Sequence, residues 1–233
     1  MIQALGLSKT YGDFLALDNL NLSIEAGHIY CLLGANGAGK STTINLFLGF
    51  IAPSKGKAVI DTIEVNEKER NTKTILAYIP ENLMLYPLLK GIENLDYFSR
   101  LAKKSYSNQE LKSFLHQAGL AESVFDKPVS TYSKGMRQKV GIAIALAKEA
   151  KALFLDEPTS GLDPRASNEF SAILLSLKEK GVATLMATHD IFRTKQVATH
   201  IGIMKEGKLV HQFENSQISL AELEQTYLDT IQS

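Results

Sequence analysis

The sequence lacks the features of a secreted, disulfide-stabilised or membrane-spanning chain. It has 233 residues, a single cysteine and no tryptophan. Cys31 cannot form an internal disulfide, so we expect a small buried core residue in a reducing compartment. The longest apolar runs, such as 140–147, hold about eight residues, whereas a helix needs roughly twenty to cross a bilayer. Residues 1–5 contain no basic segment leading into a long apolar stretch, so no secretory signal is expected.

The chain also lacks net charge. Its 25 basic residues balance its 25 acidic residues. Binding of nucleic acid or of an anionic membrane surface usually requires a strong excess of basic residues. We therefore expect no nucleic-acid partner, and if the protein works at a membrane, another protein must hold it there. The length fits one large domain, or a core with a subdomain.

A glycine-rich loop is the most informative feature that the sequence does contain. Residues 34–42 fit the pattern G-x-x-x-x-G-K-[ST]. The apolar run 29–33 predicts a buried strand before the loop, and residues 43–48 have apolar side chains at helical spacing after it. Such a loop cradles phosphate, because glycines turn backbone N–H groups inward and the helix N-terminus adds partial positive charge. The residues predicted to bind a nucleoside triphosphate are Gly34, Ala35, Asn36, Gly37, Ala38, Gly39, Lys40, Ser41 and Thr42.

Two side chains of this loop have specific expected roles. Lys40 is expected to reach the β- and γ-phosphates, and the Ser41 hydroxyl to ligate Mg²⁺. The alternative is a glycine-rich turn that happens to precede a helix. The strand–helix context and the GK[ST] ending favour the phosphate-binding interpretation.

The first third of the chain predicts mainly strands. Residues 2–24 alternate short apolar segments with turn residues, which indicates an antiparallel β flank. Further strands are expected at 58–60 and 75–79, the latter ended by Pro80. The segment 61–73 between them is polar and connecting.

Helical patterns dominate from about residue 82 to 148. Apolar residues recur at helical spacing over 92–101. Residues 107–110 form a capping box that begins a helix, and residues 135–148 are apolar nearly all round, as in a buried helix. We expect a helical subdomain here, inserted between two strands of the core.

The core pattern resumes after this segment. Residues 152–155 predict a parallel strand that is covered on both faces. Asp163 and Pro164 begin a helix, and strands are expected at 182–187 and 201–204. Ser219 is expected to cap a final amphipathic helix.

Two carboxylates end the strand at 152–155. Ligands of a doubly wound sheet lie at the carboxyl ends of its strands, so Asp156 and Glu157 are expected to face the nucleotide. Asp156 is placed to hold Mg²⁺, directly or through water. Glu157 is placed to act as the general base for an attacking water. A solvated Asp-Glu pair is the alternative, and the glycine loop makes it less favoured.

Two further candidates are less specific. His189 follows the strand at 182–187 and can reach a γ-phosphate, although a structural histidine is the safer interpretation of this residue alone. Ser133 precedes the helix at 135–148, where it either helps to form a second anion site or acts as an ordinary N-cap. The sequence leaves both roles of Ser133 open.

Taken together, these motifs resemble the nucleotide-binding subunit of an ATP-binding cassette (ABC) transporter over about residues 2–215. The matching motifs are Walker A at 34–42, Walker B at 153–156, the signature at 132–136, the D-loop at 160–163 and the switch histidine His189. The resemblance implies an ATPase with ATP and Mg²⁺ as cofactors. It also implies roles for Glu157 as catalytic carboxylate, for Tyr11 in stacking on adenine, and for Ser133, Gly135 and Asp163 in nucleotide binding.

The resemblance further implies the fold and its organisation. The expected fold class is α/β, with a P-loop NTPase (RecA-like) core of mostly parallel sheet, an N-terminal antiparallel β subdomain and an inserted α-helical subdomain. Residues 1–233 would form a single domain. Its core would comprise 1–81 and 149–233, and its helical subdomain about 82–148.

The chain departs from the family pattern at two places. Lys134 and Met136 stand where the common signature Leu-Ser-Gly-Gly-Gln has its second glycine and its glutamine, while Ser133 and Gly135 remain. Glu81 stands where the Q-loop usually has glutamine; it still offers an oxygen ligand for Mg²⁺ but adds a negative charge. Both variants resemble the branch whose membrane partners are of the ABC-2 type.

The family mechanism implies partners and a location. Two subunits would sandwich two ATP molecules head to tail, as a homodimer or with a paralogous ATPase. The dimer would drive a separate transmembrane permease, most simply an exporter, from the cytoplasmic face of the cell membrane. The apolar run 83–89 is where that permease would dock, although the same residues could simply pack the helical subdomain.

Three alternatives to a transporter subunit remain at this stage. They are a soluble ABC ATPase of the kind used in iron–sulfur assembly or on ribosomes, the ATPase of a metal-site maturation complex, and a P-loop kinase. The kinase alternative leaves the signature, the D-loop and His189 unexplained.

Overall fold

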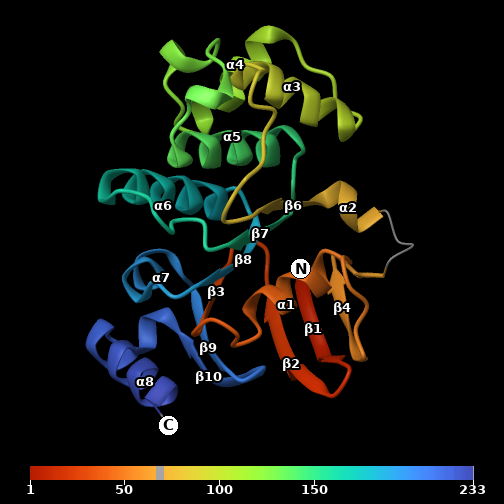
Figure 1. The fold of residues 1–233 in the computed structure, drawn as a ribbon, viewed down its shortest axis with the longest axis vertical. Coiled ribbons are helices and arrows are strands. Elements are labelled where there is room, and N and C mark those ends of the chain that lie inside the picture. Colours follow the sequence, from red (N-terminus) through yellow and green to blue (C-terminus); the bar gives the residue numbers. More distant parts are fainter. Residues whose placement is uncertain (67–70, 233) are drawn as a thin grey trace.

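The computed structural model describes residues 1–66 and 71–232, which form two sheets and a set of helices (Figure 1). The strands are β1 (Ile2–Tyr11), β2 (Phe14–Ile24), β3 (Ile29–Leu33), β4 (Lys55–Ile60), β5 (Ile63–Glu64), β6 (Leu76–Ile79), β7 (Ala152–Asp156), β8 (Ala183–Thr188), β9 (His200–Lys205) and β10 (Lys208–Glu214). The helices are α1 (Lys40–Phe47), α2 (Asn71–Ile75), α3 (Gly91–Leu101), α4 (Asn108–Gln117), α5 (Lys134–Ala147), α6 (Pro164–Glu179), α7 (Ile191–Val197) and α8 (Leu220–Gln232). In this described part of the chain, no helix combines the length and apolar character needed to cross a bilayer.

The N-terminal sheet is antiparallel, which confirms the predicted β flank. Its strand order is β2-β1-β4-β5. Ile2 of β1 lies opposite both Ile24 of β2 and Ile60 of β4, and all three side chains are buried. This sheet and α1 share one hydrophobic core.

The larger sheet has the order β10-β9-β3-β8-β7-β6, with all neighbours parallel except the edge strand β10. Its central strands read as continuous apolar runs because both of their faces are covered. Since β3, β8 and β7 are adjacent and parallel, the loops that follow them emerge at the same edge. Leu33 pairs with Thr188 and Asp156 with Ala187, which sets the glycine loop, His189 and Glu157 at that edge.

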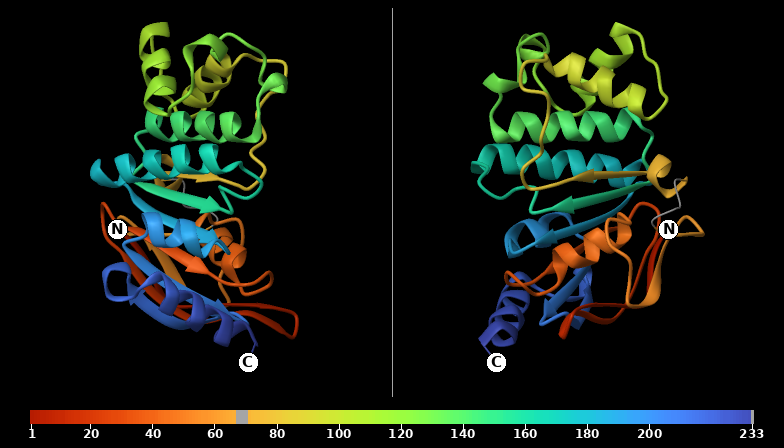
Figure 2. Two further views of the ribbon diagram at one scale, coloured as in Figure 1. Left: turned by 90° about the vertical axis from the view of Figure 1, so that its left-hand side faces the viewer. Right: turned by 45° about the vertical axis from the view of Figure 1, so that its right-hand side comes forward.

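Alternate residues of the central strands supply two different cores. Cys31 and Leu33 of β3 point into the core that includes the helices α3 to α6, whereas Tyr30 and Leu32 point into the core beneath the N-terminal sheet. Cys31 is fully buried, as predicted. Figures 1 and 2 show the resulting layers, with α3, α4 and α5 stacked beyond α6 at the end opposite the N-terminal sheet.

Most predicted elements are present, and their differences from the structure have local causes. The helix expected from residue 43 begins at Lys40, because the preceding Gly39 takes a left-handed conformation. The capping box at 107–110 is formed: the backbone N–H of Ser107 donates to Glu110 Oε2 at 2.8 Å. Of the predicted connection 61–73, residues 67–70 lie outside the described residues, and the remainder contains β5 and α2.

Besides β5 and α2, two further elements were missed from the sequence. The strand β10 lies at a sheet edge and most of its side chains are exposed, so it lacks the alternating apolar pattern of a half-buried strand. Helix α7 has only seven residues, which is too short for a helical period to stand out.

Candidate active site

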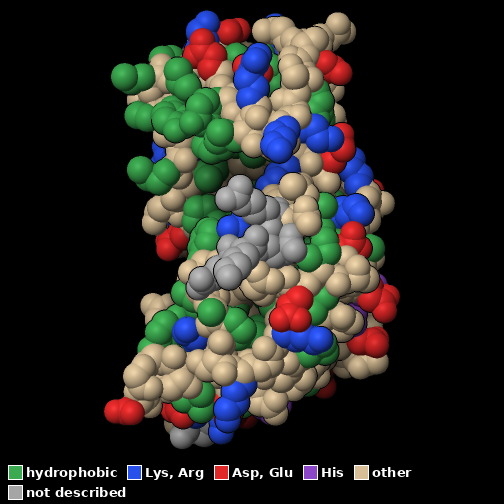
Figure 3. Space-filling model, turned by 90° about the vertical axis from the view of Figure 1, so that its right-hand side faces the viewer, with side chains coloured by type: hydrophobic (Ala, Val, Ile, Leu, Met, Phe, Trp, Pro, Cys, Tyr) green, Lys and Arg blue, Asp and Glu red, His purple; other side chains and the backbone are tan. Residues whose placement is uncertain are grey.

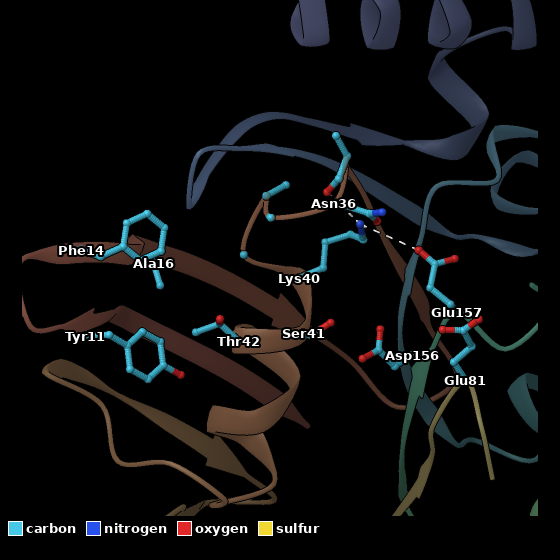
Figure 4. A pocket seen from close by; sticks show the side chains of 14 residues that line it. Tyr11, Phe14, Ala16, Asn36, Lys40, Ser41, Thr42, Glu81, Asp156 and Glu157 are labelled. Carbon is cyan, nitrogen blue, oxygen red and sulfur yellow. Dashed lines mark hydrogen bonds and ion pairs between the residues drawn. The ribbon is translucent and has the colours of Figure 1, made fainter.

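A pocket of about 360 Å³ opens at the carboxyl edge of the parallel strands, beside the glycine loop (Figure 4). Its lining combines the glycine loop with acidic residues from two strand ends and aromatic residues from the β1–β2 hairpin. The lining residues are Tyr11, Phe14, Ala16, Ala35, Asn36, Gly37, Ala38, Gly39, Lys40, Ser41, Thr42, Glu81, Asp156 and Glu157. Most residues predicted to bind nucleotide are therefore brought together in one cavity.

Backbone geometry explains why the last glycine of the loop, Gly39, cannot carry a side chain. Gly39 has φ +102°, a conformation that L side chains rarely adopt, and an added Cβ would lie 2.9 Å from the carbonyl oxygen of Ala16. Glycine is therefore required at the point where the loop turns into α1. This turn places the N-terminus of α1 at the pocket, and a helix N-terminus favours an anion.

The Lys40 side chain is buried at the floor of the loop. Its ammonium group donates to the carbonyl oxygens of Gly34 at 2.6 Å and Ala35 at 3.1 Å, and it lies 3.8 Å from Glu157 Oε1. Burial lowers the pKa of Lys40, while Glu157 and Asp156 oppose that shift. A cation held by neutral carbonyls, with a carboxylate at longer range, is prepared to accept an anionic phosphate.

Asp156 and Ser41 face each other across the base of the pocket (Figure 4). Burial raises the pKa of Asp156, the hydrogen bond from Ser41 lowers it, and the nearby Glu157 raises it further. Only oxygen donors are available from Ser41, Asp156 and Glu81, which suits a hard divalent cation such as Mg²⁺. Mg²⁺ commonly needs just one or two carboxylates, because water and substrate phosphates complete its coordination.

Glu157 is fixed by contacts at the start of its loop. It has φ +46°, an uncommon conformation for a residue with a side chain, and its backbone N–H donates to Ala187 at 2.9 Å. The Oε2 atom lies 3.0 Å from His189 Nδ1 and accepts a hydrogen bond from the Thr188 hydroxyl at 3.3 Å. His189 therefore lies behind Glu157 and outside the pocket lining, where it can orient the carboxylate.

The signature and D-loop residues lie elsewhere. No described residue of α5 lines the pocket. Ser133 caps α5 by accepting a hydrogen bond from the N–H of Met136 at 3.3 Å, and Gly135 is buried against Ala166 and Leu162. Asp163 caps α6 by accepting from the N–H of Ala166 at 2.9 Å. Within one chain, these residues stabilise helix ends and do not face the glycine loop.

Sequence reasoning missed two pocket residues, Phe14 and Ala16. Tyr11 and Phe14 lie opposite each other across the β1–β2 turn, and their side chains are 45% and 66% exposed. Figure 4 places both rings on the side of the pocket away from Asp156 and Glu157. Two aromatic residues that flank a Gly-Asp turn were the available signal, and they form a platform suited to a planar base.

The sequence matches the family described as "ABC transporter" over residues 17–160. The "Probable multidrug ABC transporter ATP-binding protein YbhF" of Escherichia coli (strain K12) is 34% identical over 90% of this chain, and the match spans 36% of that relative. The "Lantibiotic transport ATP-binding protein SrtF" of Streptococcus pyogenes is 33% identical over 90% of this chain and 89% of its own length. The chain therefore spans little more than a third of the first relative and most of the second.

Two solved structures have the same fold. The "Dimeric structure of a post-hydrolysis state of the ATP-binding cassette MJ0796 bound to ADP and Pi" has a TM-score of 0.82 and 27% identity, covering 92% of this chain and 99% of that one. The "Structure of ATP binding subunit of ABC transporter" has a TM-score of 0.84 and 28% identity, covering 98% and 99%. Both likenesses extend over nearly the whole chain.

Replacing Gly39 with alanine should disrupt the loop. We expect Gly39→Ala to lower the free energy of unfolding by about 2–4 kcal/mol, through left-handed strain and the clash with Ala16. Gly12→Ala is the matched control, because Gly12 also has positive φ but has no atom within 4 Å of an added Cβ, so only strain of about 1–2 kcal/mol applies. Urea denaturation measures both, and equal losses would contradict the close approach at Gly39.

Proposed function

The chain belongs to the ABC transporter family of ATP-binding subunits, and on that premise we propose that it hydrolyses ATP to drive a separate membrane-spanning permease. One observation carries this proposal. The pocket gathers the phosphate loop, Asp156 and Glu157 in one chain, whereas Ser133 and Gly135 of the signature lie outside it. An incomplete nucleotide site of this kind is suited to completion by a second subunit.

The pocket residues are proposed to have separate roles in ATP hydrolysis. Lys40 and the α1 N-terminus would bind the β- and γ-phosphates. Ser41 and Asp156 would hold Mg²⁺, with Glu81 as a further oxygen ligand; when bound, the ion neutralises charge on the phosphates. Glu157 would accept a proton from the water that attacks the γ-phosphorus, as the bond to the ADP oxygen breaks.

The aromatic platform and His189 would position these groups. Tyr11 is proposed to stack on the adenine ring, with Phe14 beside it. His189 is proposed to hold Glu157 in the direction of the attacking water and to approach the γ-phosphate. Its Nδ1 atom already contacts Glu157 Oε2.

A head-to-tail dimer would supply the missing part of the site. In that arrangement Ser133, Gly135 and Asp163 of one subunit approach the nucleotide held by Lys40 of the other. The related cassette MJ0796 has been solved as a dimer with ADP and Pi, which supports this arrangement. The partner is proposed to be a second copy of this chain or a paralogous ATPase.

The face beyond the pocket is proposed to bind the permease. We treat residues 82–148 as the helical subdomain, inserted between core segments 1–81 and 149–233. A groove of about 310 Å³ runs beside it, and the lining includes Leu83, Leu85 and Pro87. Leu85 is buried, whereas Met84 and Leu88 are 83% and 86% exposed, so the apolar run both packs the core and remains open to a partner.

Figure 3 shows hydrophobic side chains gathered at the upper left of the face it draws, at the end of the molecule where α3, α4 and α5 lie. An exposed apolar surface of this kind is typical of an interaction site. Through it the subunit would sit on the cytoplasmic face of the cell membrane. The permease is proposed to be of the ABC-2 type and to export its substrate; the variants Glu81, Lys134 and Met136, together with relatives named for multidrug and lantibiotic transport, support this assignment.

Co-purification discriminates between the transporter and its rivals. We expect the tagged chain, expressed in its own host and extracted in mild detergent, to recover an integral membrane protein in stoichiometric amount. Recovery only with ribosomes or with soluble metal-cluster assembly proteins would instead support a soluble ABC ATPase or a maturation factor. The kinase alternative is no longer favoured, because the chain belongs to the ABC family.

Glu157→Gln tests the proposed general base. The amide cannot take the proton from water, so turnover should fall at least tenfold, about 1.4 kcal/mol or more in activation free energy. ATP binding should persist, and size-exclusion chromatography should show an ATP-dependent dimer that accumulates because hydrolysis cannot open it. Glu224→Gln, on the exposed face of α8, is the control. Wild-type turnover in Glu157→Gln would remove Glu157 from the mechanism.

Ser133→Arg tests the shared site. A bulky cation at this position should abolish hydrolysis by blocking the partner's nucleotide. Mixing it with inactive Lys40→Ala should restore part of the activity, because a mixed dimer regains one site with both native residues. Complete inactivity of mixtures in which crosslinking demonstrates mixed dimers would contradict the head-to-tail arrangement.

A further inference from the structure

Two positions at which this chain departs from the family pattern meet in space. The ammonium group of Lys134, the first residue of α5, lies 3.5 Å from Glu81 Oε1. Glu81 follows β6 and Pro80 and lines the nucleotide pocket. A lysine at the start of the signature helix therefore contacts a carboxylate of the pocket in the same chain.

Other contacts hold the Glu81 segment in place. The Ser160 hydroxyl donates to Glu81 Oε1 at 3.1 Å. The side-chain amide of Gln138, which is fully buried, donates to the carbonyl oxygens of Pro80 and Glu81 at 3.2 Å each. Helix α5 thus fixes the backbone through Gln138 and the side chain through Lys134. Among the described residues, no hydrogen bond or ion pair is found for Glu81 Oε2, so that oxygen is available to another ligand.

The pocket is rich in negative charge, which the ion pair between Lys134 and Glu81 partly offsets. Among the residues that the structure describes, three carboxylates line the pocket, those of Glu81, Asp156 and Glu157, against one lysine, Lys40. An incoming triphosphate adds further negative charge. Glutamine at position 81 would lower the excess of negative charge in the pocket by one. In this chain the ammonium group of Lys134 compensates the extra negative charge of Glu81. The unusual residue at one position is therefore balanced by the unusual residue at the other.

We propose that Lys134 is a positioning residue that holds and neutralises the Glu81 carboxylate in the nucleotide pocket until a divalent cation takes its place. Before the cation binds, Lys134 lowers the repulsion between Glu81 and the phosphates. When the cation binds, it competes with Lys134 for the same carboxylate. The proposal rests on the proposed function only for the location of nucleotide and Mg²⁺.

Lys134→Ala should change the two binding steps in opposite directions. Without metal, in EDTA, a fluorescent imido analogue of ATP should bind about two- to fivefold more weakly, the range expected for a partly exposed ion pair. Mn²⁺ should then bind the protein–nucleotide complex more tightly by a similar factor, measured from the electron paramagnetic resonance signal of free Mn²⁺. Lys134→Arg should behave like the wild type, because it keeps the charge.

The matched controls separate positioning from other effects. In a Glu81→Gln background both shifts caused by Lys134→Ala should shrink by more than half, because the carboxylate to be held is gone. Lys112→Ala removes a lysine from a comparable pair, with Nζ 3.9 Å from Glu122 Oε1 on the exposed surface, and should change neither binding step. Circular dichroism confirms that each variant is folded.

Three results would overturn the proposal. Weakening of both nucleotide and Mn²⁺ binding in Lys134→Ala would indicate a merely structural role. Equal shifts in the wild-type and Glu81→Gln backgrounds would indicate long-range charge alone. A wild-type chain that binds no ATP analogue in either condition would instead contradict the proposed function itself, and the inference with it.

Discussion

The buried ammonium group of Lys40 is the interaction on which the rest of the site depends. It is held by the carbonyls of Gly34 and Ala35 and lies near, but not against, Glu157. A cation in this position is costly unless an anion joins it, and the α1 N-terminus directs its N–H groups at the same space. The parallel order of β3, β8 and β7 then sets Asp156 and Glu157 on the facing wall. The sheet topology thus brings the segments that follow β3, β6 and β7 to one pocket.

The same topology keeps the signature residues away from the glycine loop of their own chain. The helices α3, α4 and α5 stack beyond α6, away from α1 (Figure 1), so Ser133 and Gly135 cap and pack helices and do not reach the phosphate loop. A second subunit is the simplest source of an equivalent surface. The segment that follows β6 connects the pocket with the apolar groove, since Glu81 lines the first and Leu83 lines the second. Helix α5 contacts this segment through Lys134 and Gln138, which joins the helical layer to the wall of the pocket.

Local signals in the sequence were sufficient for the core of the fold. The strands β3 and β7 are continuous apolar runs because they are covered on both faces, and the glycine loop requires particular residues at particular turns. These constraints are short in range and leave clear patterns. The capping residues Ser107, Asp163 and Ser219 likewise marked helix starts correctly. The edge strand β10 and the short helix α7 were missed, because exposure and shortness remove the hydrophobic period.

Side-chain relations between distant segments could not be predicted in the same way. The pairing of Tyr11 with Phe14 depends on the hairpin register. Contact between Lys134 and Glu81 depends on how α5 lies over the end of β6, which no local pattern encodes. Ser133 posed a different difficulty, since the hydroxyl that caps a helix and the hydroxyl that binds an anion have the same sequence signal. Geometry in one chain shows the cap, and the second role requires another subunit.

We propose that each nucleotide site needs two subunits. The most direct measurement is the ATPase activity per molecule of the wild-type chain, at saturating ATP and Mg²⁺, over a wide range of protein concentration. Activity per molecule should rise with protein concentration until dimers predominate, in step with dimerisation followed by light scattering. A constant activity per molecule down to concentrations at which the chain is strictly monomeric would contradict it.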